Sequence, residues 1–203
     1  PGNVTLVVEG LDSKGEVVGL AGERKFTRAY PFVAKEDAPA RPYREAALKA
    51  CLYVHNMPAV QHWKNSVTPD MSYPYNAYVC KIIGATIRTE CLLAKELPYL
   101  KDEAMAIALN AAEYLVMMAQ AEKTVLEGWP PTYGVAPDDT KSHPAKVARL
   151  NAGKMMVLEA SVPGEAYLDL YDATGDPLWK ERARTIAETF ALIQNEDGSW
   201  PTR

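Results

Sequence analysis

The residues best suited to acid–base chemistry lie in one segment, where Asp138 and Asp139 are adjacent and Tyr133 and His143 are close by. Glycoside hydrolysis needs two carboxyl groups across the scissile bond, one of them protonated at neutral pH. A lyase instead needs a base, such as tyrosine or histidine, to remove the proton beside a uronate carboxyl group. These four residues are therefore the candidate catalytic residues. Alternatively, Asp139 or the next residue caps a helix that begins near Pro144, and His143 only marks the entry to that helix.

Two aromatic residues, Trp129 and Tyr133, lie in a loop that is stiffened by two prolines and flanked by glycines. Rigid, exposed aromatic rings stack on the flat C–H faces of sugars, and a tyrosine hydroxyl can bond a sugar hydroxyl. Trp129 and Tyr133 are therefore candidate substrate-binding residues. In the alternative reading, Trp129 fills the groove between two helical hairpins and Tyr133 packs on it.

Three acidic residues, Glu165, Asp169 and Asp172, recur at spacings of four and three, which places them along one side of a helix. Such a row of carboxylates could line a substrate-binding cavity. It could equally be a solvated face. In that case the carboxylates would be neutralised across a helical hairpin by three basic residues of the next helix: Lys180, Arg182 and Arg184.

Composition and spacing exclude several classes of function. With 22 basic and 26 acidic residues, the chain lacks the overall positive charge that nucleic acids or anionic membranes attract. No segment approaches the ~20 apolar residues of a membrane span. Cys51, Cys80, Cys91 and the three histidines do not have the spacing of zinc ligands. We expect no metal or other cofactor, no nucleic-acid partner and no membrane span.

Strands are predicted at the start of the chain and helices in the rest. Apolar residues at 4–8 and 17–18 flank a turn-forming segment at 12–15, which indicates a β-hairpin or short strands. The pattern becomes helical after an Ala/Pro-rich linker near residue 40. We therefore divide the chain into a β-rich appendage and linker, residues 1–40, and a helical domain, residues 41–203. Helices are expected over residues 43–55, 75–97, 102–121, 145–161, 164–173 and 177–194.

Two short junctions predict antiparallel helix pairs. At the later junction, Gly175 suits the left-handed end of one helix, Asp176 can cap the next, and Pro177 fits its first turn. At the earlier junction, residues 97–102, Asp102 is the expected cap.

The helical region also contains an internal repeat. An Ala-Glu pair at 112–113 recurs 75 residues later at 187–188, and each is followed by a glutamine and a Gly/Trp turn. In the second turn, Trp200 is expected to fill the space between helices. One repeat is thus a helical hairpin followed by a Trp/Pro loop. Because a lone hairpin cannot cover its own apolar surface, we expect a stack or ring of which the chain holds only a part.

The segment at 190–200, Phe-Ala-Leu-Ile-Gln-Asn-Glu-Asp-Gly-Ser-Trp, resembles the Gln/Trp turn of α/α toroids, which occurs in terpenoid cyclases and carbohydrate-active enzymes. The Tyr-Leu-x-Leu-Tyr core and Thr-Gly-Asp ending of residues 164–176 are similar to those of six-hairpin glycosidases and related polysaccharide lyases. The resemblance covers roughly residues 75–203. It implies an all-α fold, an α/α toroid whose ring is incomplete, to which a small N-terminal β appendage is added. No catalytic motif of a single family is matched.

The same resemblance implies a carbohydrate-active enzyme with a sugar cleft at one mouth of the ring. We expect it to cleave glycosidic bonds of a poly- or oligosaccharide, with hydrolysis ahead of lyase action on uronates. The alternatives are a non-catalytic sugar-binding or helical scaffold protein and a terpenoid-cyclase-like toroid. The resemblance also implies a bacterial periplasmic or extracellular location.

Overall fold

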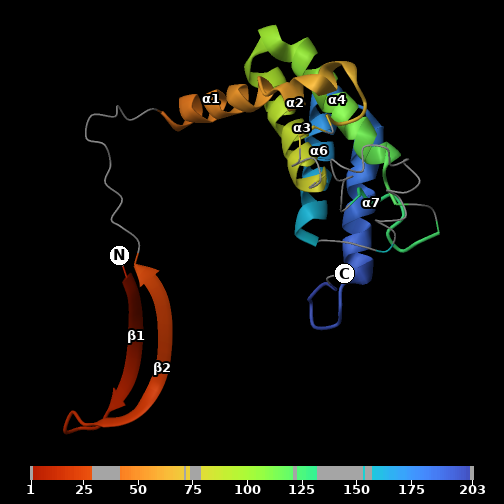
Figure 1. Cartoon of the computed structure of the whole chain (residues 1–203). Helices are drawn as coiled ribbons and strands as arrows, with labels where there is room; N and C mark the ends of the chain where they lie inside the picture. The colour runs from red at the N-terminus through yellow and green to blue at the C-terminus, as the bar shows by residue number, and fades with distance from the viewer. Residues whose placement is uncertain are drawn as a thin grey trace. The chain divides into compact units, whose positions relative to one another are not determined.

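The computed structural model describes residues 2–28, 42–70, 72–73, 79–120, 123–131, 153 and 157–201. The chain divides into two compact units, Pro1–Arg41 and Pro42–Arg203, the first holding the strands and the second the helices (Figure 1).

The first unit is a β-hairpin in which β1 (Gly2–Leu11) pairs antiparallel with β2 (Val17–Arg28). Its turn is closed by Asp12, whose carboxylate accepts a hydrogen bond of 2.9 Å from the backbone N–H of Glu16. Gly15 has a φ of 84°, a conformation that glycine adopts without steric cost. The β-hairpin predicted for this part of the chain is confirmed.

The second unit is built from helical hairpins. α3 and α4 form one hairpin, α6 and α7 form another, and α3 packs along α6 (Figure 1). No described helix is long and apolar enough to cross a membrane. The described elements, including the 3-10 helices η1 and η3, are α1 (Tyr43–His55), α2 (Pro58–Gln61), η1 (His62–Asn65), α3 (Val79–Glu96), η3 (Pro98–Leu100), α4 (Lys101–Met117), α6 (Val157–Thr174) and α7 (Pro177–Ile193).

The core of this unit lies where the two hairpins meet, and the absence of a side chain at Gly84 lets α3 approach α6 closely. A Cβ atom at Gly84 would lie 2.9 Å from Val162 Cγ1 and 3.2 Å from the backbone nitrogen of Pro163. The helices therefore pack backbone against backbone at this point. Fully buried side chains of these helices include Ile83, Ile87, Ile107, Leu115, Tyr167 and Leu170.

α6 continues through Pro163, although the sequence predicted two helices with a break at this residue. An interior proline lacks one backbone donor and costs a helix about 3 kcal/mol. Here Pro163 is buried and faces the α3 backbone at Gly84, so packing between the helices offsets the local cost. The prediction of a break was wrong because it rested on local preference alone.

The two predicted helix junctions had different outcomes. At the later one, Gly175 has a φ of 72°, and Asp176 caps α7 by accepting a hydrogen bond of 2.9 Å from Leu178 N–H, as predicted. At the earlier one, α4 begins at Lys101 after η3, and its first turn has no side-chain cap. Asp102 lies inside that turn, so its prediction as the cap was wrong.

The two glutamine-tryptophan turns also differ. In the first turn, Gln120 exchanges backbone hydrogen bonds with Gly128 and Trp129, and the Trp129 ring is 1% exposed. Trp200, in the second turn, donates its indole N–H to the Phe190 carbonyl oxygen at 2.8 Å but remains 38% exposed. Trp129 therefore fills the space between helices, as the alternative reading of the sequence described, whereas Trp200, which was expected to do the same, is only partly covered.

The prediction of an all-α toroid is wrong, because the described chain combines a two-stranded antiparallel sheet with a helical unit of two packed hairpins. These hairpins do not form a recognisable ring among the described residues. The repeat and the helix caps depend on neighbouring residues and correctly indicated hairpins. Closure of a ring depends on contacts between distant hairpins, which those local signals do not encode.

Candidate functional site

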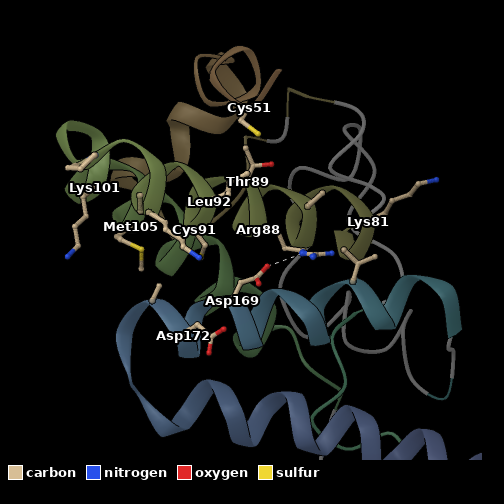
Figure 2. Close-up of a pocket in the computed structure, with 16 residues that line it drawn as sticks. Cys51, Lys81, Arg88, Thr89, Cys91, Leu92, Lys101, Met105, Asp169 and Asp172 are labelled. Carbon is tan, nitrogen blue, oxygen red and sulfur yellow. Dashed lines mark hydrogen bonds and ion pairs between the residues drawn. The ribbon is translucent and has the colours of Figure 1, made fainter. Parts of the chain in front are cut away.

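A groove of about 1120 Å³ runs along α3, which supplies half of the residues that line it (Figure 2). Its other walls come from several elements of the helical unit, with Cys51 on α1, Pro98 on η3, Met105 on α4 and Val162 on α6. The close contact of α3 with α6 at Gly84 fixes one wall relative to the floor. The groove therefore lies where helices from both hairpins meet.

Basic side chains line the groove along its length. Lys81, Arg88 and Lys95 follow one another on α3 at intervals of seven, and Lys101 is added by α4. Two helical turns contain about seven residues, so the three basic residues of α3 lie on the same side of the helix. Lys81 and Lys101 are at opposite ends of the groove, with Arg88 between them (Figure 2). A row of positive charge is thus present in a chain whose net charge is -4.

Apolar side chains alternate with these basic ones. Ala85 and Leu92 lie on α3 between the basic positions, and both line the groove. Leu92 is 40% exposed and so offers apolar surface to the groove. The floor of the groove can therefore contact charged groups and C–H surfaces in turn.

Arg88 links the floor of the groove to α6. Its Nε donates a hydrogen bond of 2.9 Å to Asp169 Oδ2, and its Nη1 donates to Glu165 Oε2. Because all three side chains are roughly half exposed, these ion pairs contribute only about 0–1 kcal/mol each to stability. Their main effect is to hold the guanidinium group in place. Its Nη2 makes no hydrogen bond to any residue that the structure describes.

Two of the acidic residues that the sequence analysis singled out, Asp169 and Asp172, line this groove, and the third, Glu165, binds Arg88. Asp172 has no hydrogen-bond or ion-pair partner in the described part of the chain. The basic residues of α7 do not neutralise this row, contrary to the expectation of the sequence analysis. Arg184 instead pairs with glutamates of its own helix, and Lys180 lies over the Tyr171 ring.

The other candidate residues are not brought to this groove by the described structure. Trp129 lies in the core, with its ring 4.9 Å from that of Phe190 between centroids. Tyr133, Asp138, Asp139 and His143 fall outside the described residues.

The two thiols that line the groove lack the properties of nucleophiles. Burial raises the pKa of Cys91 to about 12, and nearby carboxylates act in the same direction. Burial also raises the pKa of Cys51. Since the reactive form of cysteine is the thiolate, neither residue is suited to covalent catalysis at neutral pH. In the described segments, no group of three or more His, Cys, Asp or Glu residues could hold a metal ion.

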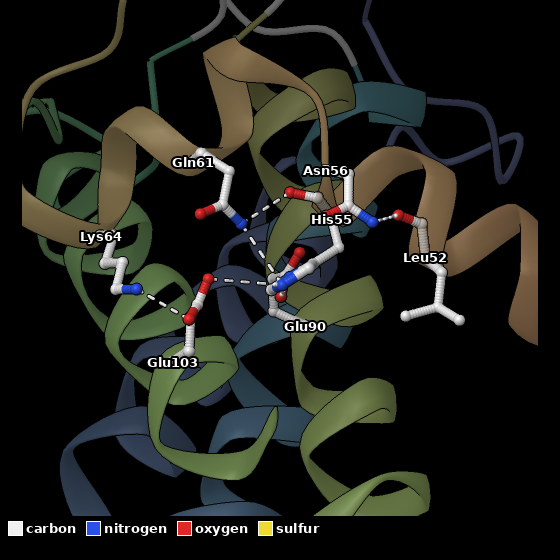
Figure 3. A network of polar contacts seen from close by, with 7 residues as sticks. All are labelled: Leu52, His55, Asn56, Gln61, Lys64, Glu90 and Glu103. Carbon is white, nitrogen blue, oxygen red and sulfur yellow. Dashed lines mark hydrogen bonds and ion pairs between the residues drawn. The ribbon is translucent and has the colours of Figure 1, made fainter. Parts of the chain in front are cut away.

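A second polar cluster lies behind the groove, where α1 ends against α3 and α4 (Figure 3). His55 Nδ1 is 2.7 Å from Glu90 Oε2, and the two side chains are 3% and 0% exposed. His55 Nε2 is 3.6 Å from Glu103 Oε1, and Glu103 also pairs with Lys64 at 2.7 Å. Gln61 completes the cluster by donating a hydrogen bond of 2.8 Å to the His55 carbonyl oxygen.

The buried carboxyl group of Glu90 dominates the electrostatics of this cluster. Burial raises the pKa of Glu90 above its usual value, although its hydrogen bond and charge interaction with His55 oppose the rise. Its second oxygen, Oε1, has no hydrogen-bond partner among the described residues. The cluster is closed to solvent at His55 and Glu90, so its arrangement suits a structural clamp between helices better than contact with a substrate.

Sequence reasoning did not identify the basic row or the Glu90 cluster. The row has a sequence signal, the interval of seven between Lys81, Arg88 and Lys95, which coincides with an ordinary solvated helix face. Glu90 has no comparable signal, because only the packing of three helices buries it. No family model, curated protein or solved structure matches the chain, so the geometry of the groove is the basis for assigning a function.

Proposed function

We propose that the groove along α3 binds an acidic oligosaccharide. The observation that carries this proposal is the row of basic side chains, Lys81, Arg88, Lys95 and Lys101, on the walls of one groove. Two acidic residues, Asp169 and Asp172, also line the groove, and Arg88 is already paired with Asp169 and Glu165, so the three lysines supply the excess of positive charge. An excess of charge of one sign in a cleft concentrates ligands of the opposite sign, even when the net charge of the protein is unfavourable.

The apolar residues of the groove favour a saccharide over other polyanions. Ala85, Leu92 and Met105 offer surface for the C–H faces of sugar rings beside the basic groups. The resemblance of residues 190–200 to a turn of carbohydrate-active enzymes supports the same class of ligand. Carboxylates of uronate residues would supply the negative charge that the basic side chains recognise.

A basic groove favours lyase chemistry over hydrolysis if the bound chain is cleaved. A lyase removes the proton beside a uronate carboxyl group. A basic side chain that binds this carboxyl group stabilises the anion that develops as the proton leaves. Hydrolysis gains nothing from such neutralisation. For the base of such a reaction the sequence analysis named Tyr133 and His143, which lie outside the described residues.

Calorimetric titration with a polyuronate and with its carboxyl-reduced form would test the proposal, since the two polymers share a backbone and differ in charge. We expect binding of the polyuronate only, with an affinity that falls as salt is added because exposed ion pairs are screened. Equal binding of the two forms, or preference for a nucleic acid of similar charge density, would contradict an acidic saccharide as the ligand.

A matched pair of variants would locate the binding site. Lys95→Ala removes a basic group from the groove, whereas Lys180→Ala removes one from α7, outside the groove. We expect only Lys95→Ala to weaken polyuronate binding, by up to about fivefold for one exposed ion pair. Absorbance of unsaturated uronates and reducing ends, read in the same samples, would distinguish lyase action, hydrolysis and binding without cleavage.

A further inference from the structure

The spacing of the basic residues in the groove defines a length. Lys81, Arg88 and Lys95 are separated by seven residues each on one continuous helix, α3. Seven residues of α-helix rise by about 10 Å and return to nearly the same side of the helix. This rise is close to the length of one disaccharide in an extended, 1,4-linked polysaccharide.

Two apolar residues of the groove repeat at the same interval of seven residues, and each lies about halfway between two basic residues. Ala85 and Leu92 are also seven residues apart, and each lies between two basic residues of the groove. A ligand lying along α3 would thus meet charge and apolar surface alternately. Burying a carboxylate against Ala85 or Leu92 would remove its hydration without a partner, which is unfavourable.

The central basic residue is held more rigidly than its neighbours. Arg88 is fixed by Asp169 and Glu165 on α6, while its Nη2 remains unbonded to the described residues. Lys81 and Lys95 have no ion-pair partner in the described part of the chain. Arg88 is therefore fixed in position at the middle of the row, where Asp169 and Glu165 share its charge, and the two lysines can adjust to the carboxylates on either side.

We infer that the groove is built for a linear polysaccharide that presents one carboxylate per disaccharide on the side facing α3, with three consecutive disaccharides on Lys81, Arg88 and Lys95. The sugars between the uronates would be uncharged and would lie over Ala85 and Leu92. This inference rests on the proposed function and adds the period and the length of the ligand to it.

The test uses alternating uronate–neutral oligosaccharides of two, four and six sugars, with binding measured by calorimetry at low ionic strength. We expect the affinity to rise by up to about fivefold with each added disaccharide up to six sugars, because each addition brings one carboxylate to one basic residue. A further disaccharide should add little. An affinity independent of length, with binding retained, would overturn the period while leaving an acidic saccharide as the ligand.

A variant and a charge-matched ligand sharpen the test. Lys81→Ala should lower the affinity for the six-sugar ligand to about that for four sugars, yet lower four-sugar binding by only about twofold, because Arg88 and Lys95 still offer one of the two positions for that ligand. A homopolymeric uronate of three sugars carries the same charge at half the spacing and should bind more weakly than the six-sugar ligand. Equal binding of these two ligands would overturn the inference. Failure of every acidic oligosaccharide to bind would refute the proposed function itself.

Discussion

His55 Nδ1 lies 2.7 Å from Glu90 Oε2, and both side chains are closed to solvent. This contact joins the last residue of α1 to the middle of α3, the helix that forms the floor of the groove. Since α1 also brings Cys51 to the groove, the pair helps to fix one of its walls. A buried carboxylate is stable only when a partner compensates for its lost hydration. The first two predictions concern this pair.

Replacement of His55 by alanine should lower the free energy of unfolding by about 3 kcal/mol, because Glu90 would be left buried without its hydrogen-bond partner. Urea denaturation followed by circular dichroism would measure the loss. Lys64→Ala provides the control, since it breaks the more exposed pair with Glu103 in the same cluster and should cost less than about 1 kcal/mol. Similar losses for both variants would mean that the buried pair has no special role.

The raised pKa of Glu90 also predicts how stability changes with pH. Its ordinary value is 4.5, and burial raises it in the folded protein. The folded state therefore binds the proton more tightly than the unfolded state does. The resulting stabilisation is complete below pH 4.5 and is lost as the pH rises through the folded value.

The comparison of the natural chain with a Glu90→Gln variant isolates this contribution to the free energy of unfolding. We expect the natural chain to lose stability relative to the variant as the pH is raised from 4.5 toward neutrality. Urea denaturation at several pH values would measure the difference. A difference that stays constant, or that grows in favour of the natural chain, would show that the pKa of Glu90 is not raised.

Two glycines of the α3 and α6 helices should respond differently to alanine. A Cβ at Gly84 would meet Val162 Cγ1 at 2.9 Å and backbone atoms at 3.2 and 3.3 Å, whereas a Cβ at Gly164 would meet Ile186 Cγ2 at 3.7 Å, an ordinary contact. Gly84→Ala should therefore cost about 1–3 kcal/mol through overpacking. Gly164→Ala should be neutral or stabilise by up to about 1 kcal/mol through helix propensity. Thermal denaturation would show whether each variant is more or less stable than the natural chain. A stabilising Gly84→Ala would contradict the close contact between α3 and α6.

The two tryptophan turns give a prediction opposite to the one that the sequence favoured. Trp129→Ala should cost about 3–5 kcal/mol, because it empties a site that is 1% exposed and packed against Phe190. Trp200→Ala should cost clearly less, since this ring is 38% exposed and mainly contributes one hydrogen bond to the Phe190 carbonyl oxygen. Denaturant midpoints of the two variants would rank them, and a larger loss for Trp200→Ala would restore the original expectation.

The sequence by itself determined the local structure wherever neighbouring residues decide it. The bounds of α1, the β-hairpin and the junction capped by Asp176 follow from apolar periodicity, turn residues and hydrogen bonds that span a few positions. The acidic row at Glu165, Asp169 and Asp172 was recognised for the same reason, because helix geometry alone places these residues on one side. Such features form from contacts within one or two helical turns, so the order of the residues is enough to specify them.

Only the tertiary structure decided which side chains of these helices and turns are buried and which charged residues pair. Arg88 reaches Asp169 across 81 positions of the chain, and Glu90 is buried only because α1 and α4 both pack on α3. Trp129 is buried and Trp200 is not, although their turns are similar in sequence. Pro163 remains helical because its cost is offset by contact with another helix. Burial and charge pairing depend on distant segments meeting in space, and neither periodicity nor spacing in the sequence carries that information.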